Sequence, residues 1–149
     1  MTEADRARIA GRPVLLYDGV CALCNGLVRF LLRRDKTGLF RFAPLEGAAA
    51  RELMGAGEGA EGVVLVVDAL WPAQREYRRS DAVAEALELL GGRWRALGSA
   101  LRMVPRGLRE WGYGVVARMR YRVFGRYAVC PIPAAGERKR FVGFEDAES

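Results

Sequence analysis

Residues 13–35 of the chain read PVLLYDGVCALCNGLVRFLLRRD, and they join two patterns of different period. Residues 13–17 are a short apolar run closed by Asp18-Gly19, which is typical of a buried strand that ends in a turn. From Cys21 to Asp35, apolar residues recur at spacings of three and four with polar residues on the other face, which predicts an amphipathic helix. A strand, a tight turn and a helix in succession indicate an α/β fold.

The following residues continue this alternation of short strands and helices. We expect strands at 39–43, 63–67 and 74–79, and helices at 45–54 and 82–90. The run VVLVV at 63–67 is apolar at every position, so it should lie inside a sheet with both faces covered, whereas 74–79 is more polar and suits an edge. Ser80 can cap the N-terminus of the helix at 82–90, and Asp81 places a negative charge in its first turn, where the helix dipole favours it. The glycine-rich stretch 55–62 is predicted to be a loop.

The C-terminal region is helical and basic. Two helices are expected at 94–103 and 106–124, separated by Pro105, and nine arginines lie between positions 93 and 126 against one acid, Glu110. With aromatic residues interleaved, this stretch could grip a phosphate backbone or lie on an anionic membrane surface. The alternative is that the aromatic side chains pack onto the sheet while arginine stems extend around them. We favour packing, because an extension of this size needs its apolar positions for burial.

Composition limits the domain organisation and the location. With 149 residues, 51% of them hydrophobic and 28% charged, the chain fits a single compact domain. We expect a flexible N-terminus at 1–12 and one domain at 13–149, divided into a core at 13–92 and a helical extension and tail at 93–149. No apolar run approaches a membrane span and no secretory signal is recognisable, so we expect a cytoplasmic protein.

The chain has a net charge of +6 and contains no histidine, and the second of these facts limits the possible chemistry. Ser-His-Asp and Cys-His activation of a nucleophile are therefore excluded, as are zinc sites that contain histidine. Catalysis would have to use carboxylates, thiols, hydroxyls or basic side chains.

The motif with reactive potential is Cys21-Ala22-Leu23-Cys24, at the junction of the first strand and the first helix. Cys21 is expected at the helix N-terminus, where unpaired N–H groups and the helix dipole stabilise a thiolate. Cys24 lies about one turn further in, on the apolar face. An exposed sulfur that attacks a disulfide and a sheltered sulfur that resolves the product are what dithiol exchange requires.

Other interpretations of the cysteines remain open. A structural zinc site would need an unusual carboxylate ligand, because only Cys130 remains as a third sulfur, and we expect no metal. Two inert core cysteines are also possible, although the placement of Cys21 at a helix start argues for exposure. Cys130 itself is either a third redox sulfur or a buried small side chain.

Asp18 stands three residues before Cys21 and also has two interpretations. It can accept the proton of Cys24 during resolution and so act as a general base. It can equally belong to an Asp-Gly turn whose side chain binds backbone N–H groups near the helix start.

The segment YDGVCALCNGLVRFLLRRD at 17–35 closely resembles the signature of the thiol-disulfide oxidoreductase DCC family, which is named for its Asp, Cys and Cys. The matching residues here are Asp18, Cys21 and Cys24. Later segments, among them RFAPLEG, YRRSDAVAEALELLGG and the closing RKRF, extend the resemblance over about residues 13 to 142. The resemblance implies a thioredoxin-like fold, with a four-stranded mixed sheet and flanking helices, and dithiol-disulfide activity.

Two further expectations follow from the resemblance. Ser80 and Asp81 resemble the place where glutaredoxins and glutathione transferases hold the γ-glutamyl end of glutathione, although ordinary capping explains Ser80 equally well. In thioredoxin-like proteins a cis-proline usually precedes the third strand, whereas Glu61 and Gly62 stand there in this chain. Docking of a substrate against that proline is therefore not expected here.

We thus predict a thiol-disulfide oxidoreductase with Cys21 as nucleophile, Cys24 as resolving thiol and Asp18 as proton acceptor. The expected substrate is a disulfide-containing protein or a small thiol, with no metal or organic cofactor and with glutathione as a conceivable co-substrate. No nucleic-acid partner and no transmembrane segment are expected. The alternative is a non-catalytic binding module, whose arginine-rich C-terminal helices contact an anionic partner or, peripherally, a membrane surface.

Overall fold

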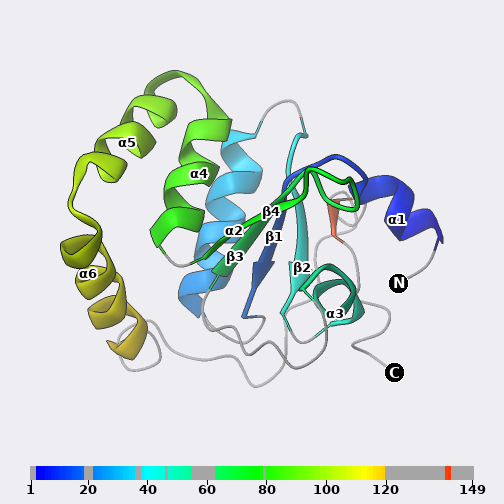
Figure 1. Ribbon diagram of the computed structural model, residues 1–149, viewed down its shortest axis with the longest axis horizontal. Coiled ribbons are helices and arrows are strands. Elements are labelled where there is room, and N and C mark those ends of the chain that lie inside the picture. Colours follow the sequence, from blue (N-terminus) through cyan, green and yellow to red (C-terminus); the bar gives the residue numbers. More distant parts are fainter. Residues whose placement is uncertain are drawn as a thin grey trace.

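The computed structural model describes residues 3–18, 22–35, 38–45, 47–54, 63–78, 80–119 and 140–141. Within these residues, helices and strands alternate along the first part of the chain, and helices follow (Figure 1). The elements in chain order are α1 (Glu3–Ile9), β1 (Val14–Tyr17), α2 (Ala22–Arg34), β2 (Arg41–Pro44), α3 (Ala48–Met54), β3 (Val63–Val67), β4 (Arg75–Arg78), α4 (Ser80–Leu90), α5 (Gly92–Met103) and α6 (Arg106–Met119).

The four strands form one mixed sheet in the order β2-β1-β3-β4. β1 and β2 are parallel, with Leu15 beside Phe42, and β3 runs antiparallel to both β1 and β4. A β1-α2-β2 unit followed by a β3-β4 hairpin and α4 is the arrangement of a thioredoxin-like fold, so the predicted fold class is confirmed. β3 is interior and fully buried, and β4 is an edge strand, both as predicted.

Side chains of successive strand residues enter two separate cores, one on each face of the sheet. Leu15 and Tyr17 join Val28 and Leu31 of α2 on one face, whereas Val14 and Leu16 pack on the other. Figure 1 shows α2 and α4 on the first side and α1 and α3 on the second. Because both faces are covered, β1 and β3 need apolar residues at every position, which explains their unbroken apolar runs.

The expected flexible N-terminus at 1–12 contains helix α1 in the structure. Ile9 at its end is fully buried in the core between the sheet and α3. The N–H of Gly11 then donates to the carbonyl of Ala69, at 2.9 Å. A seven-residue helix that buries one large apolar side chain leaves almost no periodic signal, which is why the sequence pattern did not predict it.

Strand β2 begins two residues later than expected because the carboxylate of Asp35 holds the preceding turn. Its two oxygens accept the backbone N–H groups of Leu39, at 3.0 Å, and Phe40, at 2.8 Å. These N–H groups are therefore not available for a strand ladder at this point.

Helices α5 and α6 form the C-terminal extension. α5 lies against α4 at Gly98, where a Cβ atom would come within 2.7 Å of the carbonyl oxygen of Ala84. Trp94 of α5 also packs edge-on against Phe30 of α2, with ring centroids 5.0 Å apart. The end of the second expected helix, residues 120–124, and the tail around Cys130 lie outside the described residues.

Two residues near the C-terminus contact the outer edge of the sheet. Phe141 forms a parallel bridge with Phe42 of β2, and it is buried in the same core as that residue. Arg140 lies over the Phe42 ring and pairs with Asp35. The end of the chain thus partly covers the edge that β2 would otherwise expose.

Candidate active site

Cys24 lies in the first turn of α2 and is 5% exposed. The helix begins at Ala22, the residue after Cys21, and Cys24 packs in one core cluster with Val28 and Leu31. This placement agrees with the sheltered position expected for the second cysteine. Cys21 itself lies outside the described residues, so its thiolate character stays a prediction.

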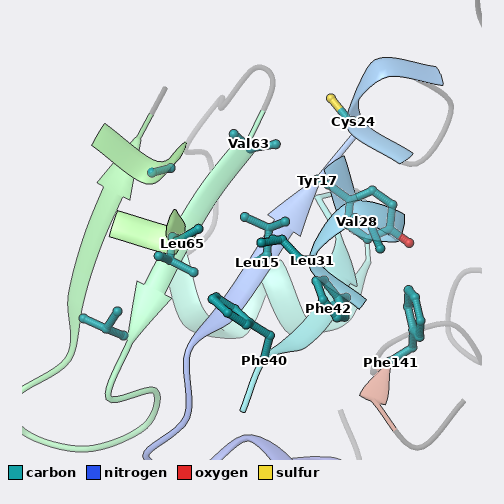
Figure 2. Packing of buried hydrophobic residues seen from close by; sticks show 13 residues of the cluster. Leu15, Tyr17, Cys24, Val28, Leu31, Phe40, Phe42, Val63, Leu65 and Phe141 are labelled. Atoms are coloured by element: carbon teal, nitrogen blue, oxygen red, sulfur yellow. The ribbon is translucent and has the colours of Figure 1, made fainter. Parts of the chain in front are cut away.

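Three elements meet at the end of the sheet where Cys24 lies. Tyr17, the last residue of β1, pairs with Val63, the first residue of β3, and Figure 2 shows both at the same end of the core as Cys24. Asp18 follows Tyr17 directly and is half-buried. The structure therefore brings Asp18 and Cys24 to one end of the sheet, as a shared site requires, while the role of Asp18 stays a prediction.

The start of α4 lies at this end as well, because Arg78 at the end of β4 pairs with Val64. Ser80 is buried, and its hydroxyl donates a hydrogen bond to the carboxylate of Glu110 on α6. The carboxylate of Asp81 pairs with Arg109, at 3.0 Å. Both residues proposed from the sequence for substrate binding thus already contact α6, and their role in binding stays a prediction.

Helix α6 also reaches the start of β3. The hydroxyl of Tyr113 accepts a hydrogen bond from the N–H of Val63, at 3.4 Å. Glu61 and Gly62, which occupy the usual place of the proline, lie outside the described residues. One helix of the extension therefore contacts both the third strand and the last sheet-covering helix beside the candidate site.

Sequence reasoning did not assign Arg109, Glu110 or Tyr113 to the site. The sequence did set Glu110 apart, because it is the single acid among the nine arginines between positions 93 and 126. The packing expected of the aromatic residues is mixed in the described part of α6, because Tyr113 contacts the sheet whereas Trp111 is 68% exposed. A helical pattern gives the face on which a residue lies, but it does not give the helix that this face contacts.

The described residues contain no group of three or more Cys, Asp or Glu side chains arranged to hold a metal ion. Among the helices that the structure describes, none combines the length and apolar character needed to cross a membrane.

Comparisons with known proteins place the chain in a family. A family model described as DCC1-like thiol-disulfide oxidoreductase matches residues 15–126. The chain is 33% identical over 133 residues to a Bacillus subtilis (strain 168) protein named "Uncharacterized protein YuxK", with 87% of this chain and 93% of that protein covered. It is 34% identical over 122 residues to a chloroplastic DCC family protein of Arabidopsis thaliana, with 81% of this chain and 70% of that protein covered. No solved structure matches it. The chain belongs to the DCC1-like thiol-disulfide oxidoreductase family.

Proposed function

We propose that the protein catalyses thiol-disulfide exchange with Cys21 and Cys24. The observation that carries the proposal is the burial of Cys24 in the first turn of a helix that begins at the residue after Cys21. Membership of an oxidoreductase family supports the same chemistry. A helix N-terminus favours a thiolate at the first position, and burial delays ionisation at the second.

The reaction has two balanced steps. The Cys21 thiolate attacks one sulfur of the substrate disulfide, which forms a mixed disulfide and releases the other substrate sulfur as a thiolate. Cys24 then loses its proton and attacks the Cys21 sulfur, which releases the second substrate thiolate and leaves a Cys21–Cys24 disulfide. Two electrons pass from the protein dithiol to the substrate, and the reverse sequence oxidises a substrate dithiol.

The second step needs an acceptor for the Cys24 proton. A thiol that is sheltered from water forms a thiolate with difficulty, because burial disfavours the charged form. Asp18 is the acceptor in this proposal, since it follows β1 directly and lies at the same end of the sheet as Cys24. A carboxylate that takes the proton as the sulfur attacks acts as a general base.

The proposed substrate is a disulfide-containing protein or a small thiol compound, and the proposed compartment is the cytoplasm. No metal or organic cofactor takes part in the steps above. Glutathione is the less favoured co-substrate, because its γ-glutamyl carboxylate would have to displace Glu110 from Ser80 and compete with the pairing of Asp81 and Arg109.

A Cys24→Ser variant tests the proposal, because it keeps the attacking sulfur and removes the resolving one. It should accumulate mixed disulfides through Cys21, seen on non-reducing gels and by mass spectrometry of tryptic peptides. Cys130→Ser is the matched control and should behave like the native protein. The proposal would be contradicted if Cys24→Ser formed no mixed disulfides, or if a Cys21→Ser/Cys24→Ser variant formed as many. The protein or thiol found in the mixed disulfide would identify the substrate.

The binding module is a second candidate, and exposed apolar residues of the extension favour it. Met103 is 85% exposed, and Leu108 and Trp111 are also exposed beside several arginines. Such a surface suits peripheral contact with an anionic membrane. Cosedimentation of the protein with phosphatidylserine vesicles tests this candidate. Binding that is weakened by salt and by Trp111→Ser would support membrane contact, whereas equal binding to neutral vesicles would contradict it.

A further inference from the structure

Arginines from three distant parts of the sequence meet at the end of the sheet opposite Cys24. Arg12 precedes β1, Arg41 is the first residue of β2, and Arg140 belongs to the tail beside β2. The guanidinium groups of Arg12 and Arg41 both donate to the carbonyl of Gly38, at 3.5 Å and 2.6 Å. Because one oxygen accepts from both, these two cations lie close together.

Arg140 is the third arginine of the group, and its charge acts on Arg41. Its guanidinium pairs with the carboxylate of Asp35 and lies over the ring of Phe42, 5.7 Å from the centroid. That carboxylate also accepts the N–H groups of Leu39 and Phe40. The Asp35 side chain is thus shared among several donors and cannot neutralise three guanidinium groups.

Within the residues that the structure describes, the three arginines retain unused donors, and only Arg140 pairs with a carboxylate, that of Asp35. The Nε atoms of Arg41 and Arg140 are buried and have no hydrogen-bond acceptor in the described structure. Burial lowers the pKa of Arg41, and the neighbouring charges of Arg12 and Arg140 lower it further, while Asp35 opposes the shift. Buried N–H donors without an acceptor, and cations that outnumber their counterions, are both unfavourable, so an added anion would stabilise this region.

We propose that Arg12, Arg41 and Arg140 form a binding site for a phosphate-type oxyanion. A tetrahedral dianion offers several oxygens, so it can accept from more than one guanidinium and supply the missing charge. The shared chemistry is a phosphate group, either as inorganic phosphate or as the end of a small phosphomonoester. The site is at the opposite end of the sheet from Cys24, and its occupancy does not depend on the proposed redox activity.

Isothermal titration calorimetry of the full-length protein with inorganic phosphate tests the proposal, at constant ionic strength in a buffer without phosphate. Phosphate should bind with measurable heat, whereas the same ionic strength of sodium chloride should not. Arg12→Gln should weaken the affinity about tenfold, because it removes a charge-assisted contact. It should leave the fold intact, since the side chain of Arg12 makes a single long hydrogen bond in the described structure, and its backbone hydrogen bonds are kept in the variant.

Arg95→Gln is the matched control, because Arg95 is an exposed arginine on α5, away from this group. It should bind phosphate like the native protein. A parallel titration with adenosine monophosphate distinguishes inorganic phosphate from a phosphomonoester as the ligand. If inorganic phosphate binds as tightly or more tightly, the ligand is the free anion; if the nucleotide binds more tightly, the ligand is a phosphomonoester. No phosphate binding, or equal loss in Arg12→Gln and Arg95→Gln, would overturn the proposal. Should Arg12→Gln not fold, Arg12→Lys removes the guanidinium while keeping the charge, and it should also weaken binding.

Discussion

The hydroxyl of Ser80, at the start of α4, donates a hydrogen bond to the carboxylate of Glu110 on α6. Beside it, Asp81 pairs with Arg109 of the same helix. These contacts join the extension to the sheet at the end where α2 and β3 begin. They also place a carboxylate of the protein itself at the N-terminus of α4, where helix N–H groups favour an anion.

Glu110→Ala should lower the free energy of unfolding by about 1–3 kcal/mol, because the buried hydroxyl of Ser80 loses its acceptor. Urea denaturation followed by circular dichroism measures this change. Glu3→Ala is the control, since the Glu3 side chain is almost fully exposed and its removal should have little effect. Equal stability of the two variants would contradict the assigned contact.

Two glycines of the extension should respond in opposite directions to replacement by alanine. Gly98→Ala places a methyl group against the Ala84 carbonyl and should destabilise the protein by about 1–3 kcal/mol. Gly112→Ala meets no atom within 4 Å and should stabilise the protein by up to about 1 kcal/mol through helix propensity. Thermal and urea unfolding of the pair measure the difference. Stabilisation by both substitutions would show that α5 does not pack closely on α4.

Asp35→Asn should destabilise the protein by about 3–5 kcal/mol, because it leaves the largely buried guanidinium of Arg140 without its counterion. Glu76→Gln is the control. It removes a more exposed pair with Arg78, for which a cost below about 1 kcal/mol is expected. Comparable urea midpoints for the two variants would contradict a buried ion pair at Asp35.

Asp18→Asn should slow the resolution of the mixed disulfide about 100-fold near neutral pH, because Cys24 loses its proton acceptor. The defect should shrink progressively as the pH rises above about 8.5, the ordinary pKa of a thiol, because hydroxide then increasingly deprotonates Cys24 without the help of Asp18. Stopped-flow measurement of the release of the second thiol tests this prediction. The first attack by Cys21 serves as the internal control and should keep most of its rate; equal slowing of both steps would assign Asp18 a structural role in the turn.

Sequence periodicity was sufficient to predict the four strands, the helices α2, α3 and α4 that cover them, and the position of Cys24, but not helix α1. VVLVV had to be a central strand because every residue of it needs a buried face, and the apolar spacing after Cys21 had to form a helix with Cys24 on its inner side. These are local properties of the chain. The family resemblance, carried by Asp18, Cys21 and Cys24, likewise needed no structure.

Tertiary structure alone decided which distant residues meet. The pairing of Phe42 with Phe141, the bond between Ser80 and Glu110, and the approach of Arg12, Arg41 and Arg140 join positions from about 30 to more than 100 residues apart. A periodic pattern records which face of an element is apolar, but the partner of that face depends on how all the elements pack together. The amino-acid order therefore determined the elements and the reactive motif, whereas packing determined that α6 contacts the candidate site and that arginines gather at the opposite end of the sheet.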